Sequence, residues 1–297
     1  MVRRTMNATT GIAKWEWMVR NTPQTEWIEG KGLFLWLAFF AMEIGAGIYF
    51  VSLLINFPKG QLIGWLFALI LGGSFHMGFL GKKYRGWRIL FRPQSSELSR
   101  GMWIILSFSL LGFFQLLPAV FSGISWSGES TAARVVMGVI CVLMMTHGFA
   151  TMGVVKALPI WNSSIMIPLS LASAIWVGSQ VVVVMSIALG GNIISAQLWA
   201  QWSIFGFTGV LAIFLWGALH SAETSNASIK MMLVGNLSGQ FYVGVVIIGI
   251  LVPVIITIAT WGSSGGWVLF LRLACVFFGD LTMRYCLMKS ALYRQLI

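Results

Sequence analysis

Eight long apolar runs constrain this chain more than any other feature of its sequence. A hydrocarbon core about 30 Å thick needs roughly 20 apolar residues in helical form. Backbone groups in lipid must find their hydrogen bonds within the protein, so only helices and closed barrels span a membrane. Runs this long and continuous indicate helices. We predict transmembrane helices near residues 33–55, 62–80, 102–121, 133–154, 165–189, 198–220, 240–260 and 267–288.

The predicted fold class is an all-α integral membrane protein of about eight transmembrane helices, arranged as two four-helix bundles. With 58% hydrophobic and 9% charged residues, the chain lacks the polar side chains to cover a globule in water, since soluble domains carry about 25% charged residues. Residues 1–32 form a polar and aromatic N-terminal segment, and residues 33–297 form the helical membrane domain. The seventh span is the hardest to define because residues 221–239 are polar, with a short amphipathic stretch at Ile229–Val234, so seven or nine spans remain alternatives.

Positive charge is distributed very unevenly between the two ends of these helices. With eight spans, both termini and every second loop share one side, and that side holds sixteen of the nineteen Lys and Arg residues. Only Lys59, Arg134 and Arg272 lie on the other side. The positive-inside rule therefore predicts that both termini are cytoplasmic, in the inner (cytoplasmic) membrane of the cell. This topology accounts for the net charge of +11 without nucleic-acid binding.

A few ionisable residues lie inside the apolar runs. Glu43 sits in the middle of the first span beside small residues, and a carboxyl group there must be neutral, paired or in contact with water. Asp280 and Arg284, four residues apart in the last span, share a helix face and can pair. We consider Glu43, Asp280 and Arg284 candidates for a proton relay, and an internal ion pair with a purely structural role is the alternative.

Three histidines lie near the ends of the second, fourth and sixth spans, which run in the same direction. His76, His147 and His220 should therefore lie at a similar depth on the basic side. Transmembrane di-haem ligation needs axial histidines at two depths, so this pattern argues against a b-type cytochrome. It suits a single quinone head-group pocket, because imidazole can exchange protons near neutral pH. For His147 and His220, hydrogen bonding to loop backbone is the alternative role.

The three cysteines, Cys141, Cys275 and Cys286, lie singly within apolar runs and lack the clustering that zinc or iron–sulfur ligation requires. We expect no metal site, no haem and no iron–sulfur cluster in this chain.

Two short segments carry a family resemblance. The first covers residues 75–101 and contains Phe75-His76-Met77-Gly78, Arg85-Gly86-Trp87 and Ser95-Ser96-Glu97-Leu98-Ser99-Arg100. The second, Gly279–Tyr285, lies near the C-terminal end of the last span. These segments resemble the NrfD/PsrC family, including the DmsC-type anchors of dimethyl sulfoxide reductases. The departures are Gly78–Lys83 in place of the family's "Gly-Arg-Pro", and Gly101 in place of an acidic residue in DmsC-type proteins.

The resemblance implies a membrane-anchor, quinone-interacting subunit of an oxidoreductase complex of anaerobic respiration. Such a subunit passes electrons between menaquinone or ubiquinone and a four-cluster ferredoxin-like iron–sulfur subunit. The iron–sulfur subunit is itself bound to a molybdopterin catalytic subunit. The chain itself would carry no catalytic residue. The quinone-binding candidates are His76, Trp36, Glu43 and His147. The partner-docking candidates are Lys82, Lys83, Arg85, Arg88, Arg92 and Arg100, whose alternative role is to set topology. A proton-coupled secondary transporter using Glu43, Asp280 and Arg272 is the alternative function.

Overall fold

The structure, a computed structural model, describes residues 20–121, 130–260 and 266–295. Within these residues, eight helices are long and apolar enough to cross a membrane, which confirms the predicted class of multi-pass helical membrane protein. The spans are α2 (Gly32–Leu54), α3–α4 (Pro58–Phe79), α5 (Glu97–Val120), α6 (Thr131–Gly153), α7 (Met166–Leu189), α8 (Ile193–Leu219), η3–α10 (Gln240–Ala259) and α11 (Gly266–Lys289).

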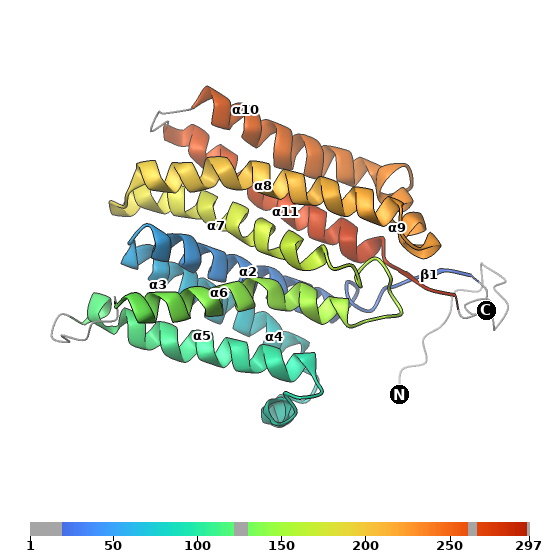
Figure 1. Cartoon of the computed structure of the whole chain (residues 1–297), viewed down its shortest axis with the longest axis horizontal. Helices are drawn as coiled ribbons and strands as arrows, with labels where there is room; N and C mark the ends of the chain where they lie inside the picture. Colours follow the sequence, from blue (N-terminus) through green and yellow to red (C-terminus); the bar gives the residue numbers. More distant parts are fainter. Residues whose placement is uncertain (1–19, 122–129, 261–265, 296–297) are drawn as a thin grey trace.

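The spans form two groups of four that meet mainly where α7 packs against α2 and α6. In Figure 1 the helices α2 to α6 form one group, and α7, α8, α10 and α11 form the other. Helix α2 packs against α3, α4 and α6 of its own group and against α7 of the other, while α7 also packs against α8 and α11. The most deeply buried span is α2, so it forms the centre of the molecule.

Two spans contain wide helical turns. Within the second span, α3 (Pro58–Leu66) and α4 (Gly73–Phe79) flank the π-helical η1 (Phe67–Gly72). The seventh span begins with π-helical turns over η3 (Gln240–Leu251) and continues as α10 (Val252–Ala259). π-Helical turns are frequent at functional sites. Nothing in the spacing of apolar residues predicts them.

Several helices begin before their apolar run, because a polar residue caps them in the interfacial region. Ser96 accepts a hydrogen bond from the Ser99 amide, and Asn192 accepts one from the Ser195 amide. Side-chain caps of this kind satisfy the first free amides of a helix. As a result α5 starts at Glu97, where the apolar run predicted 102, and α8 starts at Ile193, where it predicted 198.

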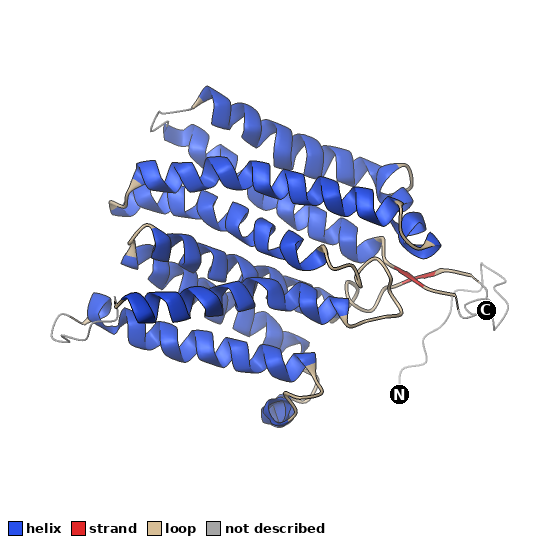
Figure 2. Cartoon of the chain, viewed as in Figure 1, coloured by secondary structure: helices blue, strands red, loops and turns tan. Residues whose placement is uncertain are grey.

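Two short helices and a pair of short strands lie at one end of the bundle. The 3₁₀ helix η2 (Lys83–Phe91) connects α4 to α5, and α9 (Glu223–Leu233) covers the amphipathic stretch noted in the sequence. The strands β1 (Thr22–Pro23) and β2 (Leu292–Tyr293) pair antiparallel, so the segment before α2 is joined to the segment after α11 (Figure 2).

Side chains reinforce this strand pair. Gln24 donates a hydrogen bond to the Met288 carbonyl, and Lys289 forms an ion pair with Glu29 at 2.8 Å. Burial and a hydrogen bond to Glu26 raise the pKa of Tyr293 to about 12. The described part of the N-terminal segment is therefore packed on the helical domain.

The contact between α2 and α7 depends on two glycines that face each other. A Cβ atom on Gly47 would lie 2.1 Å from the Ala174 carbonyl oxygen, and one on Gly178 would lie 2.5 Å from the Gly47 carbonyl carbon. Small residues allow membrane helices to approach this closely, and dispersion contacts along the seam then stabilise the pair.

We therefore expect Gly47→Leu to separate the two helix groups and to destabilise the protein by about 3 kcal/mol, the upper end of the usual cost of overpacking, since backbone must move to make room. Gly209→Leu on α8 is the matched control, because a Cβ there meets no atom within 4 Å. Thermal melting of the detergent-solubilised protein measures both. Equal melting temperatures for the two variants would contradict the proposed role of this seam.

Candidate functional site

A buried group of charged side chains joins the two helix groups. Arg284 on α11 donates hydrogen bonds to Glu43 Oε2 on α2 at 2.6 Å and to Asp280 Oδ2 at 2.8 Å. Its third donor reaches Ser173 Oγ on α7 at 2.8 Å, and that hydroxyl donates to Asp280 Oδ1 at 2.5 Å. All four side chains are buried. We call Glu43, Ser173, Asp280 and Arg284 the ion network.

Aromatic rings enclose the cation of the ion network. The Arg284 guanidinium carbon lies 5.5 Å from the centroid of the Phe40 ring and 5.2 Å from that of Phe149. A guanidinium is attracted to the face of an aromatic ring, more strongly when water is excluded. The rings and the two carboxylates together compensate for the cost of placing this charge inside a membrane.

The charges in the ion network do not balance. One guanidinium faces two carboxyl groups, so the network would carry a net charge of −1 if both were ionised. Ser170 lies 2.9 Å from Glu43 Oε2, whereas Glu43 Oε1 is buried and has no hydrogen-bond partner among the described residues. One proton on this network would make it neutral, and Glu43 Oε1 is the free position for that proton.

Two of the predicted histidines lie on either side of one phenylalanine. The ring centroid of Phe39 on α2 is 5.7 Å from that of His76 on α4 and 6.2 Å from that of His147 on α6. His147 is buried, and α5 approaches it so closely that a Cβ on Gly101 would lie 1.8 Å from its Nε2. We call His76 and His147 the imidazole pair.

Glu43 lies between the imidazole pair and the rest of the ion network. Its Oε1 atom faces α6, since a Cβ on Gly148, the residue after His147, would lie 2.2 Å from it. The side chain of Phe39 borders the same glycine. Glu43 thus directs one carboxyl oxygen toward the helix that carries His147 and the other toward Arg284.

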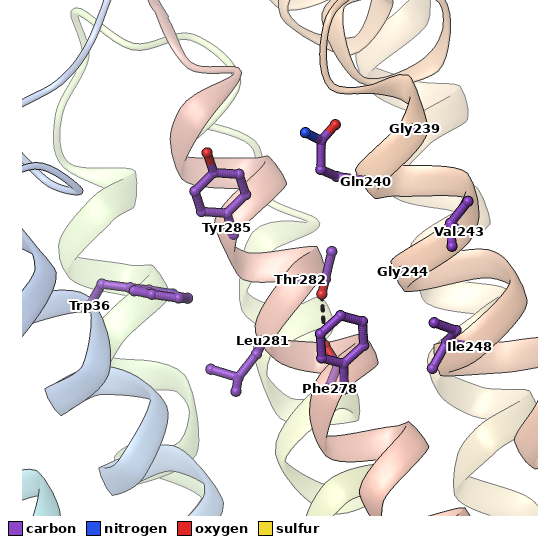
Figure 3. A pocket seen from close by; sticks show the side chains of 10 residues that line it. All are labelled: Trp36, Gly239, Gln240, Val243, Gly244, Ile248, Phe278, Leu281, Thr282 and Tyr285. Carbon is purple, nitrogen blue, oxygen red and sulfur yellow. Dashed lines mark hydrogen bonds between the residues drawn. The ribbon is translucent and has the colours of Figure 1, made fainter.

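A pocket with a cavity volume of about 640 Å³ lies between α2, η3 and α11. Trp36 borders it from α2, across from residues of η3 and α11, as Figure 3 shows. The other lining residues are Gly239, Gln240, Val243, Gly244, Ile248, Phe278, Leu281, Thr282 and Tyr285. Its walls are largely apolar, and they include Tyr285, which lies next to Arg284 in the chain.

One polar atom at this pocket has no partner within the described part of the chain. The indole N–H of Trp36 is buried and donates no hydrogen bond to another described residue. By contrast, the Thr282 hydroxyl donates to the Phe278 carbonyl at 2.8 Å (Figure 3). Buried indole N–H groups usually find a partner, so this unpaired donor is unusual. Protein atoms cover it, and it does not open onto the cavity.

The four predicted quinone-binding residues therefore fall into two places. His76 and His147 lie together at Phe39, with Glu43 one helical turn away, whereas Trp36 lines the pocket with α11. Sequence reasoning overlooked Ser170 and Ser173. Their spacing of three within an apolar run is a usable signal, because it places two hydroxyl groups on one helix face.

The remaining candidates lie outside these sites. His220 is exposed at the end of α8, with Nδ1 2.8 Å from the Trp216 carbonyl oxygen. Arg272 is buried and donates to the Thr257 hydroxyl at 3.3 Å. Arg100 forms an ion pair with Glu97, while the other predicted docking residues are exposed. Across the described ranges, no three His, Cys, Asp or Glu side chains are grouped to hold a metal ion.

The fold and these contacts define a multi-pass membrane protein with a buried ion network between two four-helix groups. In comparisons with known proteins, no family model and no curated protein matches the chain. Any family assignment therefore depends on the motif residues around His76 and in Gly279–Tyr285.

Proposed function

We propose that this chain is the membrane-anchor, quinone-interacting subunit of a multi-subunit oxidoreductase, as its resemblance to the NrfD/PsrC family implies. The observation that carries the proposal is the apolar pocket between α2, η3 and α11, which Trp36 lines from α2 and Tyr285 lines from α11. Ligand pockets typically combine apolar walls with a few polar groups that orient the ligand. A quinone ring with its isoprenoid tail has matching chemistry.

The residues around the pocket suit a menaquinone or ubiquinone. Trp36 and Tyr285 line the pocket with aromatic side chains, against which a quinone ring can pack. A bound quinone supplies two-electron, two-proton redox chemistry. The chain's own residues would hold the ring, exclude water and exchange the protons.

Glu43 is the residue best suited to link proton exchange with the histidines. Its Oε2 accepts from Arg284, and its Oε1 faces α6 next to His147. A proton on Oε1 would neutralise the ion network, and the imidazoles of His147 and His76 are groups that can take up or release a proton. The proposed route therefore runs from the ion network through Glu43 to the imidazole pair.

The proposed partners are a ferredoxin-like iron–sulfur subunit and a molybdopterin catalytic subunit, with the chain in the inner membrane. The uneven distribution of Lys and Arg supports a cytoplasmic location of both termini. In this orientation, the end of the bundle that carries the strand pair faces the cytoplasm.

The test is mass spectrometry of the complex purified in mild detergent from membranes of the source organism. We expect an iron–sulfur subunit and a molybdopterin subunit to copurify in stoichiometric amounts. A chain that purifies reproducibly alone, with no cluster-bearing subunit, would contradict the proposal.

We expect His76→Ala to abolish quinol-linked electron transfer while leaving the complex assembled, because the imidazole is proposed to exchange the proton and is only partly buried. The matched control is His220→Ala, since His220 is exposed at the end of α8. The measurement is the rate of electron transfer from a short-chain quinol to the copurified clusters, followed by visible absorbance. Wild-type activity in His76→Ala would remove His76 from the proposed route.

A second candidate is a proton-coupled secondary transporter. The observation that favours it is the position of the ion network at the contact between two four-helix groups, where transporters bind coupling ions and substrates. Arg272 would contribute a second buried cation on α11. The two functions separate in liposomes: a transporter should move solute and protons with this chain alone, whereas an anchor subunit should not.

A further inference from the structure

The short helix η2 (Lys83–Phe91) has an amphipathic and strongly basic sequence. Tyr84, Trp87 and Leu90 recur every three residues and so share one face of a 3₁₀ helix, while Arg85 and Arg88 share the adjacent face. The connecting segment 80–96 contains five Lys or Arg residues and no Asp or Glu. This segment therefore has no acidic residue of its own to pair with its cations.

The aromatic residues of η2 are unusually exposed. Tyr84 and Phe91 are each 69% exposed and Trp87 is 59% exposed. The Arg85 and Arg88 guanidinium groups lie 5.3 Å and 5.6 Å from the Tyr84 and Trp87 rings, so cation and ring sit side by side. Aromatic residues of this kind gather at the headgroup level of a bilayer.

The position of η2 in the chain is consistent with a location at the headgroup level of the bilayer. It follows the end of the second span at Phe79 and precedes the start of the third at Glu97. Figure 1 shows it end-on beyond the first turn of α5, with its axis across the long axis of the bundle. It lies beside the bundle, where lipid headgroups would surround it.

Two side chains of α5 hold η2 in this orientation. Trp103, which is itself half exposed on the lipid-facing side of α5, donates its indole N–H to the Leu90 carbonyl at 3.0 Å. Ser99 is buried, donates to the Ile89 carbonyl and accepts from the Arg92 amide. The helix is therefore fixed to a surface that is continuous with the membrane-spanning part of α5.

We propose that η2 is an interfacial helix that binds the anionic headgroup surface of the leaflet on its side of the membrane. Tyr84, Trp87 and Phe91 enter the headgroup and upper acyl region, and Lys83, Arg85, Arg88 and Arg92 bind lipid phosphates. Interfacial helices combine these two contributions, apolar burial and attraction to anionic lipid. The cations assigned to partner docking in the sequence are thus engaged by lipid, and the inference does not depend on the quinone site.

The experiment uses the full chain in nanodiscs of phosphatidylcholine, with and without phosphatidylglycerol. A Cys275→Ala background removes the half-buried thiol, and Trp87→Cys then carries an environment-sensitive fluorophore. Gln295→Cys, exposed beyond β2, is the matched control. We expect the label at 87 to be quenched by shallow doxyl lipids and protected from iodide, and the label at 295 to behave in the opposite way.

The anionic part is tested by changing Lys83, Arg85, Arg88 and Arg92 to Gln together. Each cation contributes about 1 kcal/mol near an anionic surface, so the variant should retain phosphatidylglycerol at least roughly tenfold less selectively than the wild type. Lipid retention through purification, measured by mass spectrometry, reports this. Equal retention would overturn the anionic preference. Free access of iodide to the label at 87 would overturn the proposal and favour protein docking at η2.

Discussion

Replacing Arg284 with methionine is expected to prevent the chain from accumulating as a folded protein. Methionine fills much of the same volume, but it leaves Glu43 and Asp280 facing each other inside the bundle with no cation between them. Removing one partner from a buried ion pair costs about 3–5 kcal/mol. Monodisperse yield in size-exclusion chromatography and thermal melting of the detergent-solubilised variant measure the loss.

Lys289→Met is the matched control, because Lys289 lies on the same helix and pairs with a carboxylate, Glu29, in an exposed position. Exposed pairs contribute little, so this variant should melt within about 1 kcal/mol of the wild type. Adding Glu43→Gln and Asp280→Asn to Arg284→Met should restore part of the yield, since no buried charge then remains. An Arg284→Met protein as stable as the Lys289→Met control would contradict the structural role of the ion network.

Leu281→Trp is expected to weaken quinol binding, and so to slow electron transfer at low quinol concentration, without affecting assembly. Leu281 borders the pocket from α11 and faces it in Figure 3, so a larger ring there occupies space that the ligand needs. The expected change is at least a roughly tenfold rise in KM for a short-chain quinol, equivalent to about 1.4 kcal/mol of lost binding. Steady-state kinetics of the purified complex provide the measurement.

The matched control for this variant is Leu271→Trp, which adds the same ring to α11 at an exposed position outside the pocket. It should leave KM within about twofold of the wild-type value. Comparing the two variants distinguishes an effect of filling the pocket from a general effect of a bulky residue on this helix. If both variants retain wild-type kinetics, the quinol does not use this space.

The number and approximate position of the spans could be predicted from the sequence, because a bilayer imposes a minimum apolar length on every helix that crosses it. The helix starts could not be predicted as well. A helix continues into the interfacial region when a capping residue such as Ser96 or Asn192 is present. The hydropathy of the sequence gives the length of the apolar run but does not identify the capping residues. The π-helical turns of η1 and η3 leave no trace in the apolar pattern.

The site was predictable only where its residues are close in sequence. The pair of Asp280 and Arg284 follows from their spacing of four on one helix. The participation of Glu43, 241 residues away from Arg284, depends on how α2 and α11 both pack against α7. The separation of Trp36 from the imidazole pair likewise depends on which neighbour each side of α2 faces.

Photolabelling with an azido-quinone tests the central claim, that a quinone binds between α2, η3 and α11, most directly. The complex is labelled in native membranes, with and without excess unlabelled quinol, and the modified peptides are identified by mass spectrometry. We expect saturable, competable labelling of peptides from residues 240–251 and 278–285, which line the pocket. Labelling that excess quinol does not displace, or that is no stronger there than on the lipid-facing surface of α8, would contradict the proposed quinone site.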